Sequence, residues 1–537
     1  MRLRALSFSL VLLSCLGSTI SCQGTHKRTS DSLEVLGTVN FPTSCSESSH
    51  KDFELGIARL HHMNYAGAAE SFARVIQEDP ECAMGYWGRS MTVIHPLWTG
   101  PTDNEYETGR ALLEEAKTLE PQTDREQAYI AALEAYYVDG FDQDPHRSRL
   151  ANAEPAWREL HRKYPEDLEA AAFYSLFLMA TAPQNDKTYG KQIAAGAIGE
   201  KVLAQIPDHP GAHHYIIHAY DVPPLAEGAL NVARNYGHIA PNDPHALHMP
   251  SHIFTRLGMW EESIAWNLRS AEAARQKGRT SPLGHALDYL VYAYLQTAQD
   301  GRAKIALDEI NSLAGSLPIE EGAGYAVAAT IARVALERQK WADAAKIPAR
   351  SDDAFWDTFP HFEAIRHFTR AIGAARSGDT KGAKQSIEKL EEIHAKVSAV
   401  DTYWGKQIEV QLVTSKAWLA YGEGKEHRGL EMMRRAAELE ALTEKDAVTP
   451  GEVLPSAELY GDMLSDAGRY VEAQAAFEVA LKRSPGRFNS IYGIAFAAER
   501  AGDNIKARSF YSTLIEMSVH ADTRNDKLEH AKEFLMN

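Results

Sequence analysis

The stretch Gly461-Asp-Met-Leu-Ser-Asp-Ala-Gly468-Arg-Tyr470-Val-Glu-Ala-Gln-Ala-Ala-Phe477-Glu-Val-Ala480 decides the fold class. Apolar residues recur in it with the period of an α-helix on both sides of Gly468, and Pro485 follows shortly after. The pattern predicts two helices joined by a tight turn. Small residues, among them Gly461 and Ala480, allow the helices to approach closely, while Tyr470 and Phe477 fill the remaining space.

This pattern resembles the tetratricopeptide repeat at each small or aromatic position of that repeat. Similar units surround Gly502, residues 55–80 and residues 229–241, and weaker helix–turn–helix patterns lie between them. The resemblance covers most of residues 49–520 and implies an all-α chain, an α-solenoid of tetratricopeptide-like helix pairs. We expect a linker at residues 22–48 and a C-terminal capping helix at residues 521–537.

Repeat arrays of this kind usually bind partner proteins or peptides along a concave groove, which the resemblance implies here by analogy of fold alone. The composition favours such a chain, because 44% of its 537 residues are hydrophobic and 24% are charged. The formal net charge is −17, and no run of lysine and arginine stands out. Wholesale disorder is therefore excluded, and nucleic acid is not an expected partner.

The first residues have the pattern of an export signal. Arg2 and Arg4 precede an apolar run from Ala5 to Ile20, so we expect residues 1–21 to direct export and then be removed. Thr19-Ile20-Ser21-Cys22 resembles a bacterial lipoprotein processing box, although that box usually begins with leucine. Lipidation of Cys22 would make the chain a periplasmic or cell-envelope lipoprotein that contacts the membrane only through its lipid anchor. Ordinary cleavage after Ser21 is the alternative.

Apart from Cys22, the chain would keep only two cysteines after removal of the export signal, Cys45 and Cys82. They are too few for a zinc knuckle or a disulfide scaffold. They could form one disulfide in an oxidising compartment, although no spacing rule requires it.

Histidines form a pattern in two neighbouring repeats, Pro210–Asp221 and Pro244–Phe254. His214 and His248 are 34 residues apart, and so are His218 and His252. This offset is one repeat length of the tetratricopeptide family. On a helical wheel His214, His218 and Asp221 leave the apolar face together, and the second helix repeats this arrangement. Two pairs of histidines at i and i+4 could therefore converge on one point between neighbouring helices.

We consider two interpretations of this pattern. In the first, the side chains bind one divalent transition metal such as zinc, copper or iron, because neutral imidazole is a common ligand of these ions. The proposed ligands are His214, His218, Asp221, His248 and His252. In the second, the histidines line the groove and bind one another or a partner. The groove would then also include His213, His245, Thr255, His95 and Trp98.

Pro250 complicates both interpretations, because a proline inside a helix removes a backbone hydrogen bond. If the second helix began only at Met249, His245 and His248 would leave the polar stripe.

The string His245-Ala-Leu-His-Met-Pro-Ser-His252-Ile-Phe also resembles one found in uncharacterised exported bacterial tetratricopeptide-repeat proteins. The resemblance extends to His95-Pro-Leu-Trp98 and Arg487-Phe-Asn-Ser490. It implies no particular activity.

Two classes of function follow from the sequence. The first is an exported, lipid-anchored solenoid that binds a protein, peptide or small ligand in its groove. The alternative is a metalloenzyme that uses His214, His218, His248 and His252 to hold a catalytic transition metal. The usual signatures of zinc proteases, phosphate-binding loops and esterases are absent from the sequence.

Overall fold

The computed structural model describes residues 34–119, 123–141, 144–183, 185–349 and 355–537. The chain divides into two units, Met1–Glu34 and Val35–Asn537, and all of the described helices belong to the second. The predicted export signal and Cys22 lie outside the described residues.

The second unit is all-α: none of its described residues belongs to a β-strand. Up to residue 276 the helices are α1 (Glu47–His61), α2 (Tyr65–Glu78), α3 (Ala83–Met91), α4 (Asp103–Thr118), α5 (Asp124–Glu134), α6 (Pro145–Lys163), α7 (Leu168–Ala180), α8 (Gly190–Leu203), α9 (Pro210–Tyr220), α10 (Leu230–Ile239), α11 (Pro244–His248), α12 (Pro250–Arg256) and α13 (Trp260–Gln276), with a 3-10 turn at Ala226–Ala229.

The remaining helices are α14 (Thr280–Gln296), α15 (Asp300–Leu313), α16 (Glu321–Glu337), α17 (Trp341–Ala344), α18 (Phe355–Thr358), α19 (Pro360–Arg376), α20 (Thr380–Ser398), α21 (Thr402–Gly422), α22 (Glu426–Ala441), α23 (Ser456–Asp466), α24 (Tyr470–Arg483), α25 (Phe488–Ala501), α26 (Asn504–Met517) and α27 (Asp526–Met536), with a 3-10 turn at Ala314–Ser316. Among the described residues, no helix combines the length and the apolar character needed to cross a bilayer.

The helix pair predicted at residues 461–480 is confirmed as α23 and α24. Gly468 turns the chain between them with a φ of +74°, which favours glycine. A Cβ atom on Gly461 would lie 2.8 Å from the ring of Phe477, so only a glycine lets this ring pack so closely on α23. The second helix ends at Arg483, two residues before Pro485.

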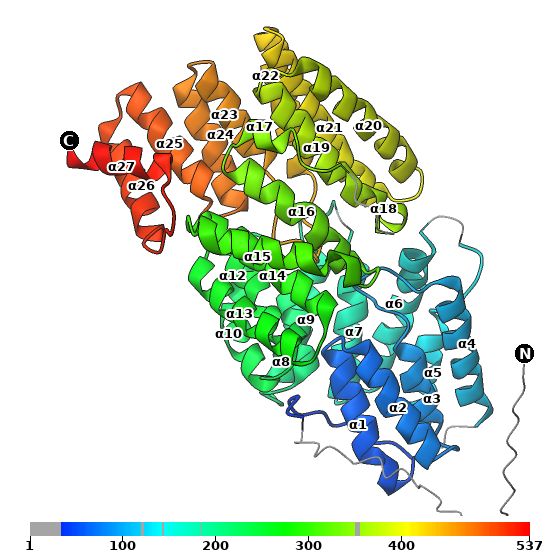
Figure 1. The fold of residues 1–537 in the computed structure, drawn as a ribbon. Coiled ribbons are helices and arrows are strands. Elements are labelled where there is room, and N and C mark those ends of the chain that lie inside the picture. The colour runs from blue at the N-terminus through cyan, green and yellow to red at the C-terminus, as the bar shows by residue number, and fades with distance from the viewer. Residues whose placement is uncertain (1–33, 120–122, 142–143, 184, 350–354) are drawn as a thin grey trace, which may run out of the picture. The chain divides into compact units, whose positions relative to one another are not determined.

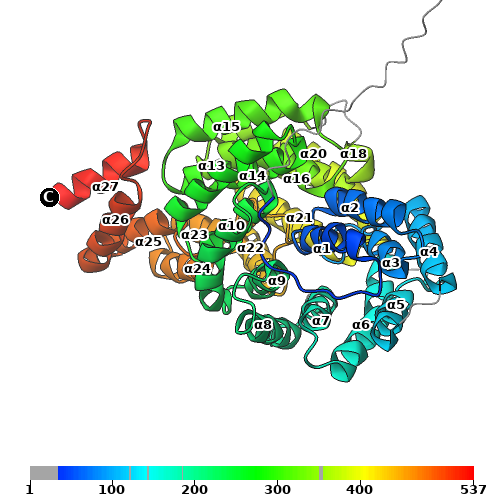
Figure 2. The ribbon, with the colours of Figure 1, turned by 90° about the horizontal axis from the view of Figure 1, so that it is seen from below.

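Helix pairs of this kind follow one another along the unit. Each helix packs on its partner and on the next pair, as α1 does on α2 and α2 on α3. The same succession joins α7 to α8 and α8 to α9, which Figure 2 shows, and ends with α27 beside α26 (Figure 1). Each helix pair buries its apolar residues against the neighbouring pairs, as the repeats of a solenoid do. This is the arrangement that the sequence predicted.

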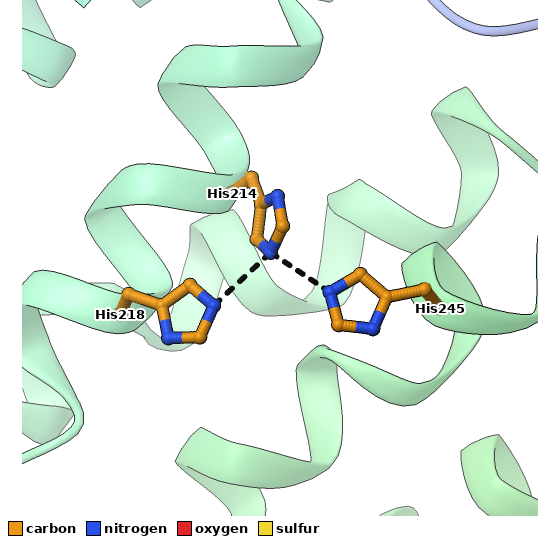
Figure 3. Close-up of side chains that lie close together, drawn as sticks. All are labelled: His214, His218 and His245. Atoms are coloured by element: carbon orange, nitrogen blue, oxygen red, sulfur yellow. Dashed lines mark hydrogen bonds between the residues drawn. The ribbon is translucent and has the colours of Figure 1, made fainter. Parts of the chain in front are cut away.

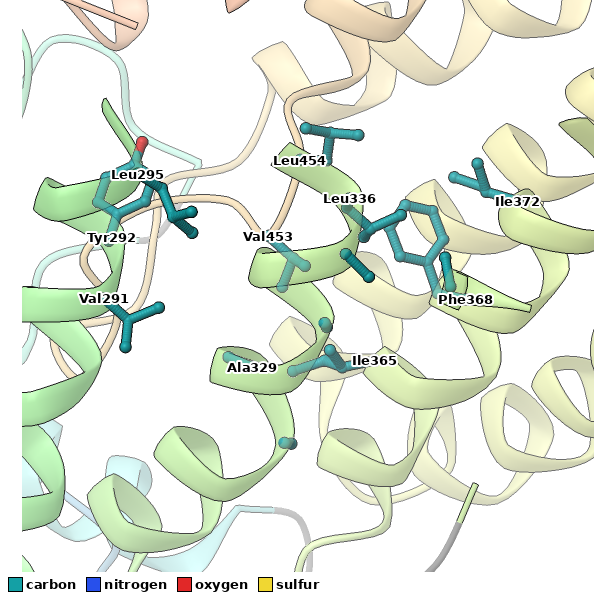
Figure 4. Packing of buried hydrophobic residues seen from close by; sticks show 14 of the residues in the cluster. Val291, Tyr292, Leu295, Ala329, Leu336, Ile365, Phe368, Ile372, Val453 and Leu454 are labelled. Carbon is teal, nitrogen blue, oxygen red and sulfur yellow. The ribbon is translucent and has the colours of Figure 1, made fainter. Parts of the chain in front are cut away.

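The connection between α22 and α23, residues 442–455, runs through the interior. Val453 and Leu454 are buried, and they belong to the same hydrophobic cluster as Leu336 of α16 and Phe368 of α19 (Figure 4). The guanidinium of Arg333 on α16 donates hydrogen bonds to the carbonyl oxygens of Gly451 and Glu452 at 2.8 and 2.9 Å. This connecting segment therefore brings its own polar residues into the inside of the helical array.

Candidate metal centre

The two histidine-bearing repeats start in register because they are capped in the same way. The Nδ1 atom of His209 accepts a hydrogen bond from the Ala212 amide at the start of α9. The Asp243 carboxylate accepts one from the Ala246 amide at the start of α11. A proline follows each cap, where it costs the helix no hydrogen bond. The caps are 34 residues apart, like the histidine pairs.

Pro250 divides the first helix of the second repeat into α11 and α12 without changing the direction of the chain. Met249, between the two helices, has helical angles, φ −51° and ψ −38°. His248 and His252 therefore stay on one side of a nearly continuous helix.

Three histidines form what we call the first triad: His214 and His218 of α9, and His245 of α11. Figure 3 shows the three rings pointing toward one another. The Nε2 atom of His214 lies 3.1 Å from Nε2 of His218 and 3.2 Å from Nε2 of His245. Two nitrogen ligands of a tetrahedral zinc ion, each about 2.0–2.1 Å from the metal, are about 3.3 Å apart. The first triad is thus close to the spacing of a ligand set.

A second triad lies next to the first and consists of His248 of α11, His252 of α12 and His285 of α14. Nε2 of His248 lies 3.0 Å from Nε2 of His252, and the rings of His248 and His285 are 4.2 Å apart between centroids. One nitrogen from each of the three histidines lies within 4.8 Å of the other two, as is also true of the first triad. The buried Nδ1 atom of His285 has no hydrogen-bond partner among the described residues.

Each triad combines two histidines at positions i and i+4 of one repeat with a single histidine from the first helix of the next repeat. The five predicted metal ligands are therefore not placed around one point. His214 and His218 belong to the first triad, His248 and His252 belong to the second, and His245, predicted only to line the groove, completes the first.

Three of the six rings are oriented by hydrogen bonds at Nδ1, the atom that faces away from the triad centre. His214 donates to the carbonyl oxygen of His61 at 2.6 Å, and His252 donates to the Asp221 carboxylate at 2.9 Å. His248 donates to Oδ1 of Asn267 at 2.7 Å. Such partners are typical of metal-binding histidines, because they fix the tautomer and aim Nε2 at the ion.

The contact with His61 requires α9 to approach α1 closely. A Cβ atom on Gly211 would lie 2.4 Å from Nδ1 of His61, so glycine at this position makes room for the His61 ring. His61 itself is held by Tyr215 and Glu169. The packing of α1 on α9 thus positions the His214 ring.

The tautomers of His248 and His252 leave two lone pairs facing each other. The amide nitrogen of Asn267 donates to the Ser263 carbonyl, so its oxygen faces His248 and can only accept. A carboxylate also only accepts, so Asp221 requires a proton on Nδ1 of His252. Neutral imidazole carries one proton, and both Nε2 atoms must then be unprotonated at a separation of 3.0 Å.

Burial keeps these imidazoles neutral. Desolvation lowers the pKa of His214 and of His285 to about 3, and it lowers the pKa values of His218, His245 and His248 well below the usual value. Desolvation also lowers the pKa of His252, although Asp221 opposes this. Neutral imidazole is the form that binds transition metals.

Asp221 lies in the layer behind the second triad. Besides the hydrogen bond from His252, its carboxylate accepts from Arg256 at 2.8 Å and from Nζ of Lys445 at 2.6 Å. Burial alone would raise the pKa of Asp221, but Lys445 and Arg256 outweigh this effect and hold it well below its usual range. The structure therefore places this predicted ligand as the partner of a histidine and of two cations.

The other predicted groove residues differ in their distance from the triads. Trp98 packs edge-on against His245, with ring centroids 5.6 Å apart, and His95 packs against Tyr65. The ring of His213 and the hydroxyl of Thr255 turn elsewhere: His213 contacts the carbonyl oxygens of Pro207 and Val232, and Thr255 contacts Ser263. Of this group, His245 belongs to the first triad and Trp98 packs against it.

Each triad has a partly exposed side. His218 and His245 in the first triad and His285 in the second are half-buried, while the other three rings are buried. Glu321 at the start of α16 accepts a hydrogen bond from Thr99, the residue after Trp98, at 2.8 Å. Burial, with Asp446 and Asp401 nearby, raises the pKa of Glu321 to about 8. A carboxyl group able to hold a proton near neutral pH therefore lies in this neighbourhood.

Sequence reasoning missed His285, Asn267, Lys445 and Glu321. His285 could not be found by the 34-residue offset, because it lies 37 residues after His248. The other three belong to α13, to the segment 442–455 and to α16, and no local pattern links them to the histidines.

Two further clusters are accounted for without a metal. His61 and His209 both contact Glu169, at 2.8 and 3.3 Å, and the remaining nitrogen of each ring has a partner of its own. Cys45 and Cys82 form the disulfide that the sequence left open.

No protein-family profile matches the sequence, and no curated protein matches it either. Among solved structures, a human IFIT1 dimer with m7Gppp-AAAA is similar at 12% identity and a TM-score of 0.38, over 91% of this chain and 98% of that chain. A human IFIT1 dimer with PPP-AAAA is similar at 13% identity and a TM-score of 0.40, over 78% and 88%. These TM-scores are too low for the ligands of those structures to be transferred.

Proposed function

We propose that this protein is a metalloprotein in which each histidine triad binds one transition-metal ion inside a tetratricopeptide-like solenoid. The observation that carries the proposal is the 3.0 Å distance between Nε2 of His248 and Nε2 of His252, two atoms that the hydrogen-bond partners of the rings leave without a proton. Two lone pairs at this distance repel each other. A cation between them turns the repulsion into two coordinate bonds.

Three protein ligands at each ion leave a coordination position open. Structural zinc sites are closed by four protein ligands, whereas catalytic sites typically keep one position for water or substrate. We propose that such a ligand enters beside His218, His245 and His285, the half-buried members of the triads. The arrangement therefore supports the metalloenzyme alternative, in which the metal polarises an oxygen ligand, over a closed structural site.

A binding role along the groove is the second candidate, and here a small ligand is favoured over a peptide. Segment 442–455 occupies part of the interior and supplies Lys445 beside the second triad. The cavity lined by Tyr325, Trp404 and Lys445 has a volume of about 50 Å³, which holds a few water-sized molecules. The net charge of −17 gives no support to nucleic acid as the ligand.

Metal titration tests the proposal. Zinc and copper are added to the purified protein and to variants with a single histidine of either triad replaced by alanine. We expect tight binding by the unchanged protein and a loss of affinity in each variant. Affinity that is unmeasurable in the unchanged protein, or the same in every variant, would leave only the groove-binding role.

We further propose that the chain is exported and anchored by lipid at Cys22. The charged and apolar pattern of residues 1–21 supports export, and so does the Cys45–Cys82 disulfide, since disulfides persist in oxidising compartments. Replacing Cys22 by serine should move the protein from the membrane fraction to the soluble fraction. If the unchanged protein is already soluble after export, the lipid anchor is refuted.

A further inference from the structure

The two triads lie next to each other. The rings of His218 and His252, from different triads, are 5.7 Å apart between centroids. The pairs His214–His218 and His248–His252, each within a triad, are 4.8 and 5.0 Å apart. Rings of different triads are thus scarcely farther apart than rings that share a centre. A second contact, between His245 and His248, has a centroid distance of 6.4 Å.

The ligand set is unusual for a pair of divalent ions. All six side chains are neutral imidazoles, and the carboxylate beside the second triad, Asp221, is bound to His252, Arg256 and Lys445. Paired iron and manganese ions in helical proteins are held largely by carboxylates, which offset their charge. Six neutral ligands leave the four positive charges of two divalent ions uncompensated.

Copper fits this set better. Imidazole suits copper, which also has the highest affinity of the first-row divalent ions for such sites. Two cuprous ions carry only two positive charges in total. Three imidazoles can complete the coordination of each ion.

From these features we infer that the two triads hold a pair of copper ions that binds dioxygen between them. The inference rests on the proposed function, since it needs metal in both triads. In the step, each cuprous ion gives one electron to dioxygen, which becomes a peroxide dianion bridging two cupric ions. No proton is consumed, and loss of dioxygen reverses the step. The bridging dianion supplies the negative charge that the six imidazoles lack.

Aromatic side chains border the two triads. Trp98 packs on His245, and the second triad is bordered by Tyr289, whose ring lies 4.5 Å from that of His248. The Tyr289 hydroxyl donates to the carbonyl oxygen of Thr449 in segment 442–455, which places this segment over the second triad. The Tyr289 hydroxyl also lies 3.4 and 3.5 Å from the two ring nitrogens of His252.

The experiment loads the mature full-length chain with cuprous ion under argon, removes unbound copper and counts the copper retained. Dioxygen is then admitted, and absorption and electron paramagnetic resonance spectra are recorded. We expect two coppers per chain, a new peroxide-to-copper absorption band, and no resonance signal, because the spins of two bridged cupric ions cancel. The band should disappear when dioxygen is removed.

Variants that break one triad distinguish a coupled pair of copper ions from single copper ions. His218→Ala and His285→Ala each break one triad, so each should retain one copper, lose the absorption band and show the resonance of an isolated cupric ion after oxidation. His427→Ala, on the exposed surface of α22, should behave like the unchanged protein. Circular dichroism confirms that each variant is folded, and His218→Gln or His285→Gln replaces the alanine variant of the same residue if that variant is not folded.

The possible failures are distinguishable. Two coppers with a full resonance signal from each would overturn the dinuclear inference and leave metal binding intact. Retention of zinc but not of copper would overturn the inference in the same way. Retention of no metal would overturn both the inference and the proposed function.

Discussion

Nε2 of His248 and Nε2 of His252 face each other at 3.0 Å, and the partners of both rings hold the protons on the opposite nitrogens. Hydrogen bonding within the protein does not explain this contact, because neither atom can donate. The same helix turn repeats 34 residues earlier, where Nε2 of His218 lies 3.1 Å from Nε2 of His214. In both pairs the two Nε2 atoms are close enough to bind one cation between them.

The first prediction concerns stoichiometry. Replacing His218 by alanine should remove the metal of the first triad and leave that of the second, because the two sets share no ligand. His285→Ala should do the reverse. Elemental analysis after metal loading should find about two ions per unchanged chain and one per variant. Two ions in either variant would refute the division into triads, and His427→Ala serves as the control.

The second prediction concerns Asn267, whose side chain holds the His248 ring. Asn267→Ala removes the acceptor at Nδ1, so His248 is free to rotate or change tautomer. The metal affinity of the second triad should fall by about 10- to 100-fold. Asn267→Asp keeps an acceptor at the same place and should retain most of the affinity. Competition with a chelator measures both, and equal affinity in the alanine variant would contradict the role assigned to Asn267.

The third prediction concerns the disulfide between Cys45 and Cys82, which are separated by 37 positions in the sequence. Closing a loop of this length restricts the unfolded chain and stabilises the folded one by about 4 kcal/mol in the chain-entropy account. Denaturant unfolding with and without a reductant should show this loss of stability. The double variant Cys45→Ser, Cys82→Ser should resemble the reduced protein and should not respond to the reductant.

The fourth prediction concerns pH. Burial raises the pKa of Asp288 to about 7, although Arg333 opposes this, and the carboxylate has no hydrogen-bond partner among the described residues. The folded state therefore holds this proton more tightly than the unfolded state, whose carboxyl group has its ordinary pKa. The contribution of Asp288 to stability is greatest at acidic pH and is lost as the pH rises toward 7, by about 1.4 kcal/mol per unit at most.

Asp288→Asn removes this titration. Between pH 5 and pH 7 the free energy of unfolding of the unchanged protein should fall by about 2 kcal/mol relative to that of the variant. Denaturant unfolding at both values measures the difference. Parallel behaviour of the two proteins would show that Asp288 is ionised throughout the range.

The helix pairs could be predicted from the sequence because each depends on local features. The small residues and aromatic rings around Gly461 and Phe477 recur within one repeat length and act within one pair of helices. The register of His214 with His248 is equally local, since the caps at His209 and Asp243 set the start of each helix.

The full set of residues around the site could not be predicted from the sequence, because their proximity comes from tertiary packing and not from a periodic pattern. His285 lies 37 residues after His248 because α13, the helix between them, has 17 residues, whereas α10, which lies between His214 and His248, has 10. Lys445 reaches Asp221 from 224 residues away because segment 442–455 runs through the interior. Asp221 looked like a ligand on the helical wheel, but its contacts with Arg256 and Lys445 arise only from tertiary packing.

The central claim is that both histidine triads bind transition metal, and anomalous X-ray diffraction from crystals of the metal-loaded protein tests it most directly. We predict two anomalous peaks, one among His214, His218 and His245 and one among His248, His252 and His285. A single peak would contradict the division into two sites. No peak at either triad, in crystals grown with excess zinc or copper, would contradict the claim altogether.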